Sequence, residues 1–120
     1  MISAHSPAVA PMREWKWSPH EKTVARRAFN LALRRELESV MREARERAAR
    51  ITEASDLWEL ERWLGERRRQ IDGTFDYRYS ELPRVFARLL RAGQLGDDDL
   101  RGLAPDKLDE IRSMARIRLD

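Results

Sequence analysis

The chain of 120 residues has no cysteine, which excludes disulfides, thiolate zinc sites and thiol nucleophiles together. It has only two histidines, His5 and His20, and neither has a companion at metal-ligand or catalytic spacing. We therefore expect both to be ordinary surface residues. A phosphate-binding glycine loop and a nucleophile elbow are also missing from the sequence. These absences predict a protein that is not an enzyme and that has no cofactor.

Long apolar runs are missing as well, since no window approaches the roughly 18 consecutive apolar residues of a membrane span. Residues 1–11 have neither the charged start nor the apolar centre of a secretory signal. We therefore predict a cytoplasmic protein that does not contact a membrane. The hydrophobic fraction of 42% and the charged fraction of 38% indicate one folded domain that is rich in exposed helix.

Charge of one sign does not dominate either, because 24 basic residues are interleaved with 21 acidic ones. The run Arg67-Arg68-Arg69 would point in three directions around a helix, whereas a nucleic-acid footprint is continuous along one face. The pattern argues against nucleic acid as the partner, although a basic nucleic-acid-binding dimer stays open as an alternative. The acidic run Asp97-Asp98-Asp99 would make a calcium loop with Leu108 at the position of the twelfth ligand, so a helix N-terminus explains it better.

A very long helix is the clearest element of the sequence. Ser18 is its expected N-cap, Pro19 its first residue and Glu21 the residue that closes a capping box. Nothing breaks the helix before about Ile51, and its length of roughly 50 Å exceeds the diameter of about 35 Å of a compact domain of this size. Its apolar seam would stay exposed in a monomer, which predicts a homodimer. The seam residues expected in the dimer core are Phe29, Leu33, Leu37 and Val40.

Shorter helices are predicted to follow, separated by turn signals. Pro83 fits only in the first turn of its helix, and Gly93 is a typical helix stop. No segment alternates like a strand. The expected elements are a break with possible caps at Thr52 and Ser55, a helix to about Gln70, a turn at Asp72-Gly73, a helix from near Tyr79–Ser80 to Ala92, a helical turn at 97–103 and a last helix at 105–119.

The sequence therefore predicts an all-α fold, in which a long-helix stem carries a small helical head and two copies form an antiparallel helical homodimer. The expected division is a flexible N-terminal arm at residues 1–16, a stem for dimerisation at 17–72 and a head at 73–120.

Two tryptophans of the second helix stand beside arginines, and these two residue types carry much of the binding energy between proteins. Trp63 is next to an apolar stripe of Leu57, Leu60 and Leu64, so we expect these four residues to hold the fold. Trp58 lies off that stripe. Its indole ring could either pack between two subunits or contact another partner, and both alternatives remain open.

A distinctive set of residues is distributed from Trp17 to Arg116. It comprises Trp17-Ser18 with Glu21, Asp56-Leu57-Trp58 with Leu60 and Leu64, then Arg68, Ile71-Asp72, Asp76-Tyr77-Arg78-Tyr79-Ser80, Val85-Phe86, Leu89 and Gly93. In this set the chain resembles the fluorescence recovery protein family, and the block from Asp56 to Gly93 is its specific part.

The resemblance implies a fold and a function. Members of that family are all-α dimers with a long-helix stem and a compact head. They bind the photoactivated orange carotenoid protein through its C-terminal domain and speed its return to the inactive orange state, which ends photoprotective quenching. Neither bond chemistry nor a cofactor is involved, since the mechanism is a difference in affinity for two states of the partner.

The resemblance also implies site residues. Trp58 and Arg68 match stem positions used for dimer formation and partner binding, and Glu61 and Arg62 lie between them. Arg62 stands where the family has an aspartate. In the head, the candidates for partner binding are Arg84, which replaces a phenylalanine, Phe86, and Glu110, which replaces a lysine.

These departures concern the binding surface and not the scaffold. Two of them invert a charge and one replaces an aromatic anchor by a cation, which changes what a partner must present. A diverged member that keeps the dimeric scaffold but binds a different protein is therefore the alternative to a regulator of the orange carotenoid protein.

Overall fold

The structure is a computed structural model that describes residues 15–117. Within this range the chain forms the four α-helices α2 (Pro19–Ala49), α3 (Ala54–Thr74), α4 (Leu82–Ala92) and α5 (Pro105–Arg116), and the short 3-10 helix η1 (Asp97–Leu100). No strand is present among these residues, which confirms the predicted all-α fold. Nearly all of the predicted arm lies outside the described residues, as do the last residues of the predicted C-terminal helix.

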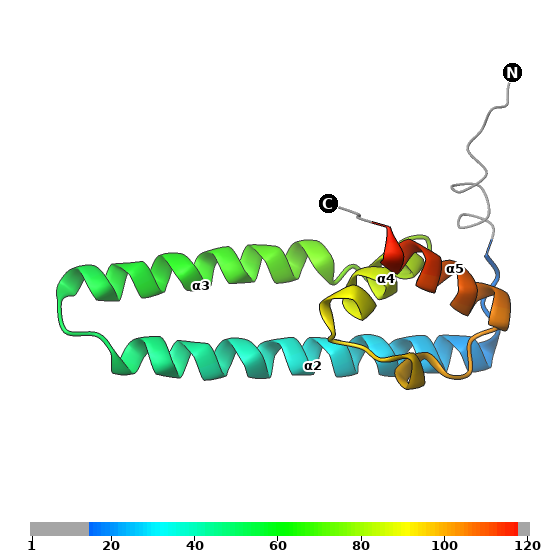
Figure 1. Cartoon of the computed structure of the whole chain (residues 1–120), viewed down its shortest axis with the longest axis horizontal. Helices are drawn as coiled ribbons and strands as arrows, with labels where there is room; N and C mark the ends of the chain where they lie inside the picture. Colours follow the sequence, from blue (N-terminus) through cyan, green and yellow to red (C-terminus); the bar gives the residue numbers. More distant parts are fainter. Residues whose placement is uncertain (1–14, 118–120) are drawn as a thin grey trace, which may run out of the picture.

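α2 and α3 form an antiparallel hairpin that gives the molecule its length (Figure 1). The 31 residues of α2 correspond to about 46 Å of helix. α3 lies beside the C-terminal part of α2, whereas α4, η1 and α5 gather around its N-terminal part. One helix thus belongs to both a stem and a head, whereas the sequence-based division assigns it to the stem alone.

The only group of fully buried apolar side chains in the described range lies in the head. α2 contributes residues from Val24 to Ala32, and α4 contributes most of one face. Phe29 is 6% exposed, and its ring packs edge-on against Phe75 and Tyr77 at centroid distances of 5.4 and 4.9 Å. The expectation that Phe29 lies in a dimer seam is therefore wrong, because the head of its own chain covers it. The core residues are Val24, Ala25, Ala28, Phe29, Ala32, Leu82, Val85, Phe86, Ala87, Leu89, Leu95, Leu100, Leu103 and Ile111.

Local signals set most helix ends. The capping box at the start of α2 is confirmed, since the backbone N–H of Glu21 donates to Ser18 Oγ at 3.1 Å and that of Ser18 donates to Glu21 Oε1 at 3.0 Å. Pro83 lies in the first turn of α4, and Gly93 ends that helix with a left-handed φ of 81°. α4 begins only at Leu82 because an earlier start would place Pro83 deeper in the helix, where its ring clashes with a backbone carbonyl.

Both ends of α3 differ from the prediction. The predicted turn at residues 72–73 is wrong, since α3 continues to Thr74 and the N–H of Phe75 still donates to the carbonyl of Ile71 at 2.9 Å. A helical glycine costs only about 1 kcal/mol, so the tertiary contacts of this last turn can override Gly73. At the other end the N-cap is Glu53 rather than either predicted residue. The Asp56 carboxylate accepts the N–H groups of Thr52 and Glu53, and these bonds lower its pKa.

A buried ion pair joins the start of α2 to α5. Lys107 Nζ lies 2.6 Å from Glu21 Oε1, and both residues are 7% exposed. The other carboxylate oxygen of Glu21 accepts the N–H of Ala104 at 2.9 Å, and Lys107 also donates to the carbonyl of Lys16. Burial would raise the pKa of Glu21, but the bonds from Lys107, Ser18 and Ala104 outweigh it and lower the pKa to about 2.

Replacing Glu21 by glutamine tests this ion pair, because glutamine can still complete the capping box. The folded-state pKa of Glu21 lies below its ordinary value of 4.5. Its stabilisation is therefore complete above about pH 4.5 and is lost as the pH falls toward 2. We expect E21Q to lower the free energy of unfolding by about 3 kcal/mol at pH 7, because Lys107 stays buried without its partner. The loss should shrink below pH 3 in urea titrations. If E21Q lowers the free energy of unfolding equally at pH 7 and below pH 3, the ion pair does not account for the stabilisation.

Candidate partner-binding surfaces

The stem has no fully buried core of its own. From Leu33 to Glu81 no side chain is fully buried in the structure. α3 turns the half-buried Leu60, Trp63 and Arg67 toward α2, and the Arg47 guanidinium lies over the Trp63 ring at 4.5 Å from its centroid. The expectation that Trp63 helps to hold the fold is thus confirmed, because its ring packs against Arg47 of α2.

Exposed apolar side chains are concentrated on the stem. Leu57 and Leu64 of α3 are 46% and 40% exposed, and Leu37 and Met41 of α2 are 42% and 50% exposed. We call these four residues the apolar stem face. Leu57 and Leu64 were expected to hold the fold of the single chain, which is wrong, because one neighbouring helix cannot cover them. Of the other predicted seam residues, Leu33 and Val40 are half-buried.

Trp58 lines an open groove on α3. Its side chain is 56% exposed. The groove has a volume of about 410 Å³ and is lined by Trp58, Glu61, Arg62, Gly65 and Arg69. The structure thus brings together three of the four predicted stem residues. The fourth, Arg68, points elsewhere and lies 3.9 Å from the Asp72 carboxylate in an exposed pair.

The head candidates have different surroundings. Arg84 is exposed on α4 and forms an ion pair with Glu81 at 2.9 Å. Glu110 is half-buried on α5. The prediction that Phe86 contacts a partner is wrong, because its ring is fully buried in the head core. The i, i+3 and i+4 pattern of α4 signals this burial, since Phe86 shares its face with Leu82, Leu89 and Leu90.

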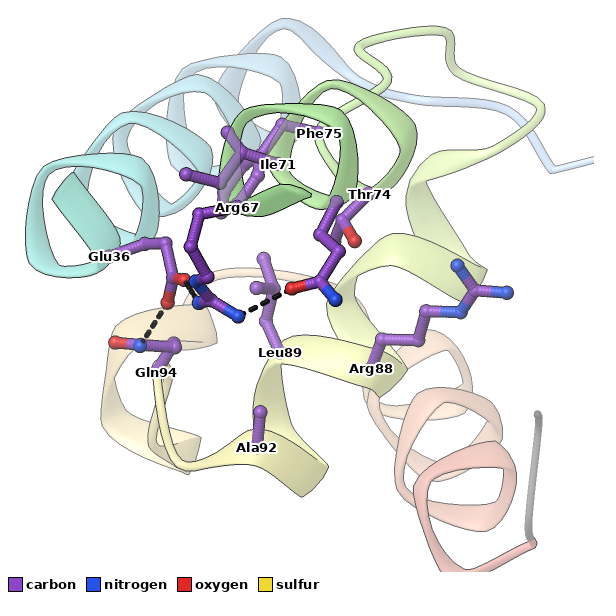
Figure 2. A pocket seen from close by; sticks show the side chains of 10 residues that line it. Glu36, Arg67, Ile71, Thr74, Phe75, Arg88, Leu89, Ala92 and Gln94 are labelled. Atoms are coloured by element: carbon purple, nitrogen blue, oxygen red, sulfur yellow. Dashed lines mark hydrogen bonds and ion pairs between the residues drawn. The ribbon is translucent and has the colours of Figure 1, made fainter. Parts of the chain in front are cut away.

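A pocket of about 250 Å³ lies where stem and head meet (Figure 2). Glu36 of α2 stands at its edge with a side chain only 14% exposed, and its carboxylate pairs with Arg67 of α3. The Gln94 amide donates to Glu36 Oε1 at 2.6 Å, and the Gln94 carbonyl accepts from Arg35 at 2.9 Å. Figure 2 shows Glu36 between Arg67 and Gln94, so one carboxylate links α2, α3 and the segment that follows the head helix α4. We call these three residues the junction triad.

The sequence contains no local signal for the junction triad. Glu36 is 31 positions from Arg67 and 58 from Gln94. In the sequence, each residue of the triad resembles an ordinary exposed polar residue. Lys107 was missed for the same reason, since its buried partner Glu21 is 86 positions away.

Two features are absent from residues 15–117. No cluster of three histidine, aspartate or glutamate side chains is placed to hold a metal ion in that part of the chain. Likewise, none of the described helices combines the length and the apolar character needed to cross a membrane.

Comparison with known proteins gives a consistent result. Residues 17–115 match the family model described as photoprotection regulator fluorescence recovery protein. The fluorescence recovery protein of Synechocystis sp. (strain ATCC 27184 / PCC 6803 / Kazusa) is 38% identical over 104 residues, which cover 87% of this chain and 95% of that protein. The solved structures of the fluorescence recovery proteins from Fremyella diplosiphon and Synechocystis sp. PCC 6803 are 42% and 37% identical. Each has a TM-score of 0.81, and the match covers 85% of this chain and all of theirs.

The junction triad gives a prediction about stability. Glu36→Gln keeps an acceptor for Gln94 but removes the charge that holds Arg67, so we expect the free energy of unfolding to fall by about 1–2 kcal/mol. Amide hydrogen exchange near Gln94 should become faster, since the head would be held less firmly. The matched control is Glu43→Gln, which breaks the exposed pair with Arg47 on the same helix and should cost about 0.5 kcal/mol or less. If the two variants lose equal stability, the triad has no special role.

Proposed function

The chain belongs to the fluorescence recovery protein family, and we propose that it acts as a dimeric, non-enzymatic regulator that binds the photoactivated orange carotenoid protein and accelerates its return to the orange state. The match to a family of photoprotection regulators over residues 17–115 carries this proposal, because it spans both stem and head. The exposed Trp58 on the stem and Arg84 on the head lie at two of the positions through which the resemblance implies partner contact.

The proposed dimer is supported by the stem. A hairpin without a buried core exposes apolar surface that a second hairpin can cover, which produces a four-helix arrangement. The 3.6-residue period places Leu57 and Leu64 on one side of α3. It likewise places Leu37 and Met41, which are about one turn apart, on one side of α2. Because these residues are 40–50% exposed, a second copy can bury them without any change in the fold of the chain. The covering surface would be the same face of the second copy.

Acceleration without bond chemistry requires selective binding. A regulator speeds a conformational return only when it binds the transition state of that return more tightly than the photoactivated state. Each tenfold acceleration requires a difference of about 1.4 kcal/mol between these two affinities. A rigid scaffold with separate stem and head contacts can supply such a difference, because the two contacts are satisfied together in only one arrangement of the partner.

A different protein partner is the second candidate, and the positions of the departing residues favour it. Arg62 and Arg84 are exposed, and Glu110 is half-buried, so all three alter the surface and leave the core intact. The nucleic-acid alternative has less support, because arginines on each of the four α-helices are paired with carboxylates of the same chain. Examples are Arg47 on α2, Arg67 on α3, Arg84 on α4 and Arg112 on α5.

The dimer can be tested by light scattering during gel filtration. At micromolar concentration we expect a mass of about twice the 14.2 kDa of the chain. The double variant Leu57→Asp/Leu64→Asp should elute as a monomer, because it places charges in the proposed interface. Ile117→Asp is the control, since it changes an apolar residue of the head that is 58% exposed. A wild-type mass of one chain would contradict the dimer.

The regulatory function can be tested optically. Adding the protein to photoactivated orange carotenoid protein in the dark should speed the return of its absorbance from red to orange. At subsaturating concentration Trp58→Ala should weaken this effect by about tenfold or more, since an exposed tryptophan is a typical binding anchor. An unchanged return rate with the wild-type dimer would reject the orange carotenoid protein as partner and leave the second candidate.

A further inference from the structure

The groove on α3 faces away from α2. Trp58, Arg62, Gly65 and Arg69 follow one another at spacings of four, three and four residues, which places them on one side of the helix. Leu60, Trp63 and Arg67, which lie toward α2, are on the other side. The indole and both guanidinium groups of the groove are exposed, so they do not serve the packing of the hairpin.

The groove exists because residue 65 is a glycine. Without a side chain at this position, the helix backbone forms a floor between Trp58 and Arg69. A Cβ atom added at Gly65 would lie 3.6 Å from Arg69 Nη1, which shows that this guanidinium lies directly beside the floor. The resulting space combines an aromatic wall with a cationic wall.

The two arginines of the groove have no partner among the described residues. No carboxylate of residues 15–117 lies within 4.0 Å of Arg62 or Arg69, whereas their neighbours Arg67 and Arg68 are paired with Glu36 and Asp72. Glu61 is the one acidic residue of the lining, so the lining carries an excess of positive charge. A guanidinium group binds a carboxylate through two parallel hydrogen bonds, and an exposed indole binds apolar or aromatic side chains.

A second copy of the chain does not account for the groove. Successive helical residues are about 100° apart, so Trp58 is rotated by that angle from Leu57, and Arg62 by about 140°. A copy that covers Leu57 and Leu64 would leave Arg62 at the outer edge of the stem. The charges of the groove therefore remain available to another molecule.

We propose that the groove of Trp58, Arg62, Gly65 and Arg69 binds an acidic segment of a partner protein. Carboxylates of the segment pair with Arg62 and Arg69, and an apolar side chain between them packs on the indole of Trp58. This acidic-segment site does not depend on the orange carotenoid protein being the partner, because it concerns the chemistry of the contact and not the source of the segment.

The test uses two synthetic peptides and the full-length dimer. One peptide alternates glutamate and aspartate with leucine and phenylalanine, and the other replaces every acid by its amide. Binding is followed through the indole N–H resonance of Trp58, which Trp58→Phe assigns among the four tryptophans of the chain. We expect the acidic peptide alone to shift this resonance, with an affinity that falls as salt is raised.

Three variants locate the binding. Arg62→Ala/Arg69→Ala should weaken the acidic peptide about tenfold or more, whereas Arg45→Ala, at an exposed arginine of α2, should not. Gly65→Leu should fill the groove and abolish binding while keeping the helix, because leucine is a better helix former than glycine. The site is rejected if the amide peptide binds equally well, if neither peptide shifts Trp58, or if the arginine double variant keeps full affinity. A loss of dimer mass in that variant would instead assign the two arginines to the interface between copies.

Discussion

The structure depends on one helix that is too long for the domain it belongs to. Five residues of α2 are buried and form one wall of the head core, namely Val24, Ala25, Ala28, Phe29 and Ala32. After Glu36, α2 extends beyond that core, and among the described elements only α3 lies beside it there. Two helices side by side cannot enclose an apolar core, so the stem keeps exposed leucines while the head is closed. This division separates a stable folding unit from a surface that is available for association.

Polar links hold the long helix to the rest of the chain at two points. At its start, the buried pair of Glu21 and Lys107 joins the helix to α5, and the aromatic rings of Trp15 and Trp17 cover the ammonium group. Near its middle, Glu36 joins the helix to α3 and to the segment that follows α4. An unpaired charge at either place would cost more than an exposed one, because both carboxylates are largely shielded from water. These links therefore fix the orientation of the head on the stem.

The proposed binding to a partner uses side chains that folding leaves exposed. The leucines of the apolar stem face on α3 and the groove around Trp58 lie on different sides of that helix, so the proposed second copy and the proposed acidic segment would contact different surfaces. Arg62, Arg84 and Glu110, at which the resemblance implies a changed binding surface, lie outside the head core. Substitutions at these three positions can thus change which partner the surface fits without disturbing the packing of the core.

The sequence by itself determined the elements whose causes are local. The capping box at Ser18, the glycine stop at Gly93 and the position of Pro83 depend on residues a few places apart, and the long helix follows from an uninterrupted period. Only the tertiary structure decided which apolar residues are covered by the chain itself. Phe29 and Leu57 are both apolar residues at helical spacing, yet the head buries the first and leaves the second exposed. The difference depends on where a distant helix ends, as does the meeting of Glu36 with Arg67 and Gln94, and no short-range pattern carries that information.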